Sequence, residues 1–130
     1  GHAAGDAVLK AVASRLRQRL STVGEDAAAF GRIGGEEFAV VLAGKSAQKA
    51  SLIAEELVDA VRGLNIATAG KTLAVTISAG SAVQRLPCNL DAVISQADAA
   101  LYAAKTSGRD RALAAHDKVA VQDAAGRAAA

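Results

Sequence analysis

Residues 32–38 read Arg-Ile-Gly-Gly-Glu-Glu-Phe, so that two glycines and two carboxylates stand between two apolar segments. The flanking segments, residues 29–33 and 38–42, are short, and the second is rich in residues that favour β-strands. The two glycines allow the positive φ angles of a tight turn between such strands. The stretch therefore predicts a β-hairpin with both glutamates at its tip.

The predicted tip has the chemistry of a metal-assisted phosphate site. Glu36 and Glu37 are adjacent carboxylates that can bind a hard cation. Gly34 and Gly35 lack a Cβ, so a phosphate can approach the backbone there. The hairpin alone leaves a second interpretation open, because Gly-Gly is often only a turn and paired acids are often only solvated turn residues.

The composition limits the broad class of the protein. A chain of 130 residues, 52% of them hydrophobic, fits one domain with one core. Its 15 basic and 13 acidic residues give a net charge of +2, which is no reason to expect binding to nucleic acid or to membranes. A lone cysteine, Cys88, and the lack of an apolar run near ~20 residues predict a soluble, cytoplasmic segment, and any membrane anchor would precede residue 1.

Apolar residues recur at helical spacing in three segments, which predict three helices. Asp6 is expected to cap the first helix or to lie in its first turn, and Ser46 to cap the second. The third is expected to begin at Asn89 or Asp91. Its apolar stripe consists of Leu90, Val93, Ile94, Ala97, Leu101 and Ala104.

The remaining pattern predicts the fold class. Residues 73–79 predict another strand, with a partner for it near Ile66. Helices that alternate with strands and a hairpin indicate an α/β (α+β) sandwich, in which helices pack on a mixed, largely antiparallel sheet. From residue 112 onward no strand pattern follows, so we expect a domain over residues 1–112 and a tail over residues 113–130.

Three further segments accompany the hairpin in a fixed order. Residues 1–9 read Gly-His-Ala-Ala-Gly-Asp-Ala-Val-Leu, and residues 75–80 read Val-Thr-Ile-Ser-Ala-Gly. Residues 97–109 read Ala-Asp-Ala-Ala-Leu-Tyr-Ala-Ala-Lys-Thr-Ser-Gly-Arg. Together with Gly-Gly-Glu-Glu-Phe at residues 34–38, these segments resemble the GGDEF domain family, the diguanylate cyclases. The resemblance implies a ferredoxin-like core, related to the palm of nucleotide cyclases and polymerases.

The resemblance also implies an activity. Two GTP molecules would be joined into cyclic di-GMP, a bacterial second messenger, with release of pyrophosphate and with Mg²⁺ as cofactor. Each GTP would be held by one of two facing domains in a homodimer. Glu36 would be the catalytic carboxylate beside the metal and the 3′-hydroxyl, with Glu37 as its partner in metal coordination. Gly34 and Gly35 would accept the substrate against the turn.

Three other residues match positions that bind substrate in the family. The resemblance implies that Asp6 accepts hydrogen bonds from the guanine edge and that Lys105 and Arg109 bind phosphates. Each has a simpler interpretation, because an acid at a helix start and cations at a helix end also suit the helix dipole.

One departure from the family pattern affects the expected activity. In the family, a strand and a helix that carry a metal-binding Asp and a guanine-binding Asn precede the Gly-His segment, and this sequence begins after both. We therefore expect an N-terminally truncated domain, or one whose exposed sheet edge pairs with another chain. The intact parent, with a sensory or regulatory domain upstream, is expected to be the active enzyme, and the fragment alone to be inactive. The alternatives are a catalytically inactive GTP-binding or dimerising regulatory domain and an unrelated α/β adaptor.

Overall fold

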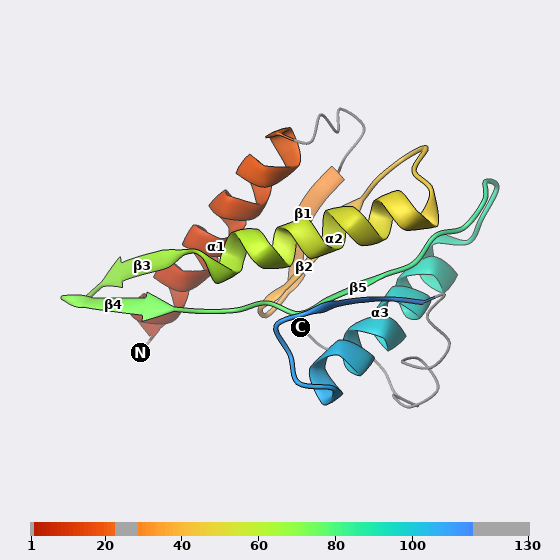
Figure 1. Cartoon of the computed structure of the whole chain (residues 1–130). Helices are drawn as coiled ribbons and strands as arrows, with labels where there is room; N and C mark the ends of the chain where they lie inside the picture. Colours follow the sequence, from red (N-terminus) through yellow and green to blue (C-terminus); the bar gives the residue numbers. More distant parts are fainter. Residues whose placement is uncertain (1, 23–28, 116–130) are drawn as a thin grey trace.

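The computed structural model describes residues 2–22 and 29–115, and this part of the chain contains three helices and six strands (Figure 1). In chain order they are α1 (His2–Thr22), β1 (Ala29–Gly34), β2 (Glu37–Val41), α2 (Ala47–Arg62), β3 (Asn65–Thr68), β4 (Lys71–Ala74), β5 (Ala79–Ser81), α3 (Leu90–Thr106) and β6 (Ala112–Ala114). The α+β class predicted from the sequence is confirmed. The domain boundary at residue 112 stays a prediction, and residues 116–130 of the expected tail lie outside the described residues.

Local sequence determines where two of the helices begin. The Ser46 side chain accepts a hydrogen bond from the Lys49 amide at 3.1 Å, and the Asn89 side chain accepts one from Ala92 at 3.3 Å. Ser46 is the predicted N-cap of α2, and Asn89 is one of the two predicted starts of α3. The prediction that Asp6 caps α1 or lies in its first turn is wrong, because α1 already begins at His2 and its first turn has no acid.

The main core lies where α1 and α2 pack against each other and against the hairpin. Its buried residues are Val12, Leu16 and Leu20 of α1 with Ile53, Leu57 and Val61 of α2. Phe30, Phe38 and Val40 of the hairpin are partly buried against this cluster. Burying a Leu, Ile or Val side chain contributes about 1.5–3 kcal/mol, so these two apolar stripes supply much of the driving force for folding. The hairpin is thereby attached to the most stable part of the molecule.

The strands form three separate two-stranded ladders within the described part of the chain. β1–β2 and β3–β4 are antiparallel, and β5–β6 is parallel. Ile66 pairs with Leu73, as expected. The predicted strand over residues 73–79 belongs to two of these ladders rather than to one continuous sheet. Residues 75–78 between them have no ladder partner among the described residues, although the exposure still alternates from Val75 to Ile77.

The contact between β5 and α3 depends on a glycine. A Cβ at Gly80 would lie 2.8 Å from the Cα of Leu101 and still closer to the Ala97 carbonyl oxygen and the Leu101 amide nitrogen. No side chain fits between β5 and α3 at this position. The helix can therefore lie directly on the strand backbone only because residue 80 is a glycine.

The buried face of α3 differs from the stripe predicted for it. Its fully buried residues are Ala100, Ala103 and Ala104, whereas Leu90 and Ile94 are 55% and 39% exposed. The prediction is confirmed at Ala104 and wrong at Leu90 and Ile94, because helical spacing does not show that a closely packed helix buries its smallest side chains. The sequence also did not predict β6, whose three residues become a strand only by pairing with β5.

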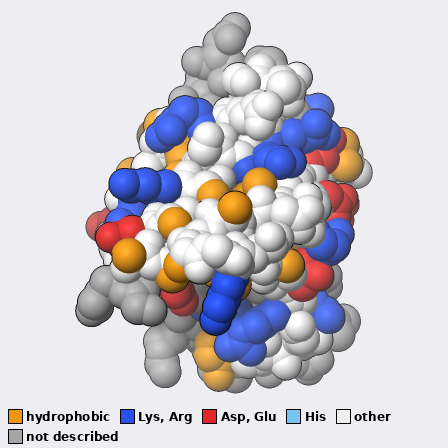
Figure 2. Space-filling view, turned by 90° about the vertical axis from the view of Figure 1, so that its left-hand side faces the viewer, with side chains coloured by type: hydrophobic (Ala, Val, Ile, Leu, Met, Phe, Trp, Pro, Cys, Tyr) orange, Lys and Arg blue, Asp and Glu red, His pale blue; other side chains and the backbone are white. Residues whose placement is uncertain are grey.

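Charges of both signs are spread over the surface. Figure 2 shows Lys and Arg side chains interspersed with Asp and Glu on the face at the left of Figure 1, with isolated hydrophobic side chains between them. This mixture agrees with the small net charge of +2. No helix in the described segments has the length and apolarity required to cross a bilayer.

Candidate active site

The β1–β2 hairpin ends in a two-residue turn made by Gly35 and Glu36. Gly34 is paired with Glu37, and Gly35 has a φ of +51°, in the left-handed region that favours glycine. A Cβ added at either glycine would meet no described atom within 4 Å. The glycines therefore serve the backbone conformation of the turn, and they leave its surface open to a ligand.

A bulge and an arginine shape the turn from the β1 side. The register shifts between Arg32 and Gly34, so that Ile33 is the extra residue of a bulge, and its side chain is 60% exposed. The Arg32 Nε donates a hydrogen bond to the Gly35 carbonyl oxygen at 2.7 Å. Arg32 thus closes the turn that carries the acids. Its role could not be identified from sequence, because an arginine beside a turn carries no signal of its own.

Aromatic rings attach the base of the hairpin to α1. Phe30 and Phe38 stack with their centroids 5.6 Å apart and their planes at 12°, and the Arg17 guanidinium lies 5.4 Å from the Phe30 centroid. Stacked rings and a cation over a ring each add a modest attraction beyond burial. Because Phe38 directly follows the two glutamates, this stack limits where the tip can move.

Lys105 on α3 lies within electrostatic reach of the hairpin tip. Partial burial is the largest influence on its pKa and lowers it. Glu36 and, more weakly, Glu37 oppose this shift, while Arg109 adds to the lowering of the pKa. The structure therefore places Lys105 within electrostatic reach of Glu36 and Glu37, on the hairpin that carries Gly34 and Gly35, and Arg109 within reach of Lys105. These two acids and two bases, from distant parts of the sequence, form a loose charged cluster around Lys105.

A third carboxylate joins this cluster. Burial raises the pKa of Asp98 on α3, and the nearby charge of Glu37 raises it further. Asp98 precedes Lys105 by two helical turns, so both residues lie on the same side of α3. Asp98 was not predicted as a site residue. The seven-residue spacing from Lys105 was the signal that could have identified it.

Asp6 is not joined to this cluster by any contact among the described residues. It lies exposed in the second turn of α1. Arg109 follows the end of α3 with a φ of +61°, and its amide donates a hydrogen bond to the Ala104 carbonyl oxygen at 2.9 Å. The backbone that carries Arg109 is therefore in a specific and uncommon conformation.

The acids of the tip suit a magnesium ion in kind and number. Glu36 is exposed and Glu37 is half-buried, and they are adjacent in the chain. Magnesium is commonly held by one or two carboxylates, with waters and substrate phosphates at its other positions. The described residues contain no group of three His, Cys, Asp or Glu side chains arranged to hold a metal. The hairpin therefore fits a shared magnesium site, completed by a substrate, rather than a closed protein cage.

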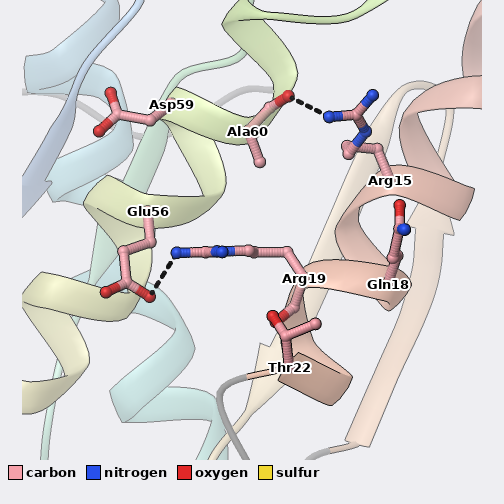
Figure 3. A pocket seen from close by; sticks show the side chains of 7 residues that line it. All are labelled: Arg15, Gln18, Arg19, Thr22, Glu56, Asp59 and Ala60. Carbon is pink, nitrogen blue, oxygen red and sulfur yellow. Dashed lines mark hydrogen bonds and ion pairs between the residues drawn. The ribbon is translucent and has the colours of Figure 1, made fainter.

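A cavity of about 400 Å³ between α1 and α2 contains none of the predicted site residues (Figure 3). Two arginines of α1 already contact α2 across this cavity. Arg19 lies 3.6 Å from the Glu56 carboxylate, and the Arg15 guanidinium donates to the Ala60 carbonyl oxygen at 3.4 Å. We therefore interpret this cavity as a groove of the helix interface and place the candidate site at the hairpin and α3.

Comparison with known proteins identifies relatives of this chain. The family model described as "Diguanylate cyclase, GGDEF domain" matches residues 1–111. Diguanylate cyclase DgcP of Pseudomonas aeruginosa is 40% identical over 111 residues, which are 85% of this chain and 16% of that protein. Diguanylate cyclase A of Treponema denticola is 40% identical over 112 residues, which are 85% of this chain and 29% of that protein. The chain thus spans less than a third of the length of either relative.

Solved structures share the same architecture. Diguanylate cyclase SiaD from Pseudomonas aeruginosa, crystallised in complex with its activator SiaC, has a TM-score of 0.79 and 35% identity, over 88% of this chain and 42% of that one. The GGDEF domain of DgcB from Caulobacter crescentus, crystallised in complex with c-di-GMP, has a TM-score of 0.71 and 29% identity, over 82% of this chain and 64% of that one.

Proposed function

The chain belongs to the GGDEF family of diguanylate cyclase domains, and from this membership we propose that it condenses two GTP molecules into cyclic di-GMP as part of an intact domain that faces a second copy. One observation carries the proposal. The Gly-Gly-Glu-Glu-Phe hairpin is complete, and its carboxylates lie within electrostatic reach of Lys105. An acid beside a base at an open backbone turn suits both the hydroxyl and the phosphates of a nucleotide.

The basic residues bind the triphosphate in this proposal. Lys105 supplies a point charge, and Arg109 supplies a fork of donors that matches phosphate oxygens. Gly34 and Gly35 leave the turn surface free of side-chain atoms, so the phosphates can lie against it. The positive charges offset the repulsion between a polyanionic substrate and the two glutamates of the tip.

Glu36 performs the proton transfer in this proposal. The 3′-oxygen of one GTP forms a bond to the α-phosphorus of the other, the bond to pyrophosphate breaks, and the hydroxyl proton moves to a Glu36 carboxylate oxygen. Glu36 and Glu37 would hold Mg²⁺, which, when bound, neutralises phosphate charge and lowers the pKa of the hydroxyl. Each step occurs twice, because the product contains two phosphodiester bonds.

Substrate selection and partners complete the proposal. Asp6, exposed on α1, would accept hydrogen bonds from N1 and N2 of guanine, which adenine cannot donate.

One GTP sits on each of two domains, so the active form is a homodimer, and a regulatory segment of the intact protein controls how the domains meet. By analogy, the structure of SiaD with its activator supports control of the domain by another polypeptide segment, and that of DgcB with c-di-GMP supports binding of the product. A cytoplasmic location, where GTP is available, belongs to the same proposal.

The decisive experiment incubates the intact protein with GTP and Mg²⁺ and separates the products. Cyclic di-GMP is expected from the wild type, and Glu36→Gln is expected to abolish it while GTP binding persists. Glu55→Gln, which changes an exposed glutamate of α2, serves as the control and should leave turnover intact. GTP binding without product in the wild type would indicate a regulatory nucleotide-binding domain instead. Residues 1–130 alone are expected to give no turnover.

A further inference from the structure

The turn after α3 is held in a conformation that most residues avoid. Gly108, Arg109 and Asp110 have successive φ angles of +130°, +61° and +50°. Glycine adopts such angles readily and aspartate tolerates them, but arginine has no side-chain group that favours them. Left-handed residues outside glycine persist only where surrounding contacts hold them. The conformation of Arg109 therefore calls for contacts that hold the turn.

Those contacts come from Arg62, the last residue of α2. The Arg62 Nε lies 3.1 and 3.0 Å from the two carboxylate oxygens of Asp110, and Nη2 donates to the Asp110 carbonyl oxygen at 3.2 Å. The remaining nitrogen, Nη1, contacts Asp59 one turn earlier on α2. One guanidinium thus holds both the side chain and the main chain of Asp110, and its contacts to Asp110 use nitrogens other than the one that contacts Asp59.

Arg109 is held on both sides of its Cα atom. Its amide is bonded to Ala104, and its carbonyl oxygen accepts a hydrogen bond from the Arg111 Nε at 2.9 Å. The peptide that joins Arg109 to Asp110 is planar, so the position of Asp110 also determines where the Arg109 carbonyl points. With both peptides fixed, the direction of the Arg109 side chain is fixed at its base.

We propose that Arg62 and Asp110 are positioning residues that hold the left-handed turn so that Arg109 presents its guanidinium beside Lys105. This inference rests on the proposed function, because only there does Arg109 have a phosphate to bind. It goes beyond that function by assigning a role to two residues that do not themselves reach the hairpin tip. The α2 helix thereby becomes part of the substrate site.

The Arg62–Asp110 ion pair is exposed, which allows a positioning role to be distinguished from a role in the stability of the whole domain. The side chains of Arg62 and Asp110 are 47% and 35% exposed. Exposed ion pairs contribute little to the stability of a fold. Removing the Arg62 guanidinium should therefore leave the domain folded, and its effect should concentrate on the turn and on phosphate binding.

The first test measures hydrogen exchange at the Arg109 amide. In Arg62→Gln the exchange rate should rise about two- to fivefold, the range expected for loss of an exposed ion pair. Asp59→Asn removes the other partner of Arg62 but leaves the contacts to Asp110, and exchange at Arg109 should then change little. Equal exchange in Arg62→Gln and wild type would overturn the proposed clamp, whether or not the protein binds GTP.

The second test measures GTP affinity in the intact protein. Arg62→Gln should weaken GTP binding about two- to fivefold, and Asp110→Asn should weaken it similarly, because each breaks the same ion pair. In an Arg109→Ala background, Arg62→Gln should have no further effect, which a general loss of structure would not produce. If the wild type binds GTP and Arg62→Gln binds it equally well, the positioning role is wrong. If the wild type does not bind GTP, the proposed function fails, and the exchange data alone decide whether the clamp exists.

Discussion

Gly80 of β5 lies so close to Leu101 of α3 that an added Cβ would fall 2.8 Å from the Leu101 Cα atom. The neighbouring contacts are also to backbone atoms of α3, which cannot rotate away as a side chain can. The position of α3, and with it that of Lys105, is therefore tied to the absence of one side chain.

Gly80→Ala should destabilise the domain severely. The methyl group must push α3 away from β5, so we expect a loss of about 3 kcal/mol or more, at the upper end of overpacking costs. Urea unfolding followed by circular dichroism measures it. Gly63→Ala is the matched control, because a Cβ there meets no described atom within 4 Å. Similar midpoints for the two variants would refute the close packing of α3 on β5.

Gly35→Ala should destabilise the hairpin through its backbone conformation. A non-glycine residue at a φ of +51° costs about 1–2 kcal/mol, even though no neighbour obstructs its Cβ. Gly31→Ala, in β1 of the same hairpin, has the same open surroundings without the positive φ, and it should be close to neutral. Urea unfolding of both variants gives the difference, and equal stabilities would mean that the turn does not require glycine.

Leu57→Ala should test the core between α1 and α2. Leu57 is 8% exposed and belongs to the main cluster, so its truncation should cost about 2–5 kcal/mol. Leu52 lies on the same helix but is 47% exposed, and Leu52→Ala should cost far less. Thermal and urea unfolding compare the two. A larger loss of stability in Leu52→Ala than in Leu57→Ala would show that the face of α2 described here as buried is not the one that packs in the core.

Asp98 should make stability depend on pH. Its folded-state pKa is raised by burial and by Glu37, so the folded state binds its proton more tightly than the unfolded state does. Its contribution is therefore most favourable below the ordinary pKa of 3.8 and is lost as the pH rises through the folded-state value. Asp98→Asn should be more stable than wild type at neutral pH, with an advantage that shrinks toward about pH 3. Urea unfolding at both pH values measures this, with Glu55→Gln as the control. A stability difference between Asp98→Asn and wild type that does not change with pH would exclude a raised pKa of Asp98.

Lys105→Met should test the phosphate contact directly. If Lys105 binds a phosphate oxygen, its loss should weaken GTP binding about tenfold, the order expected for one charge-assisted hydrogen bond. Lys49→Met changes an exposed lysine on α2 and should leave the affinity unchanged. Isothermal titration with GTP measures both variants. Equal affinities for Lys105→Met and wild type would remove Lys105 from the substrate site.

The parts of the fold that could be predicted from sequence are those determined by neighbouring residues. Ser46 and Asn89 cap helices through side chains that reach only three residues ahead, and the hairpin turn requires glycine where it stands. The strand β6 could not be predicted, because its three residues pair with β5 only after α3 has brought them there. Ala100 and Ala103 on the buried face of α3 were missed for the same reason, since only the partner strand shows how closely a helix is packed.

In the candidate site, too, sequence revealed what neighbouring residues determine and missed what tertiary packing determines. The acids of the tip were evident because they stand side by side in the sequence, and their roles stay predictions. Arg32 bonds to Gly35 across the turn, and Asp98 comes near Glu37 through the packing of α3. Arg62 reaches Asp110 from the end of α2. Nothing in the local sequence of Arg32 or Arg62 distinguishes such a contact from ordinary solvent exposure, whereas the seven-residue spacing from Lys105 could have identified Asp98.

Residues 75–78 link β4 to β5 in extended form, and no described strand pairs with them. Backbone donors and acceptors in that state are a template for any passing strand. Purification and storage at high concentration should therefore favour self-association along this segment. A strand supplied by a neighbouring domain would protect this segment against aggregation as well as extend the fold.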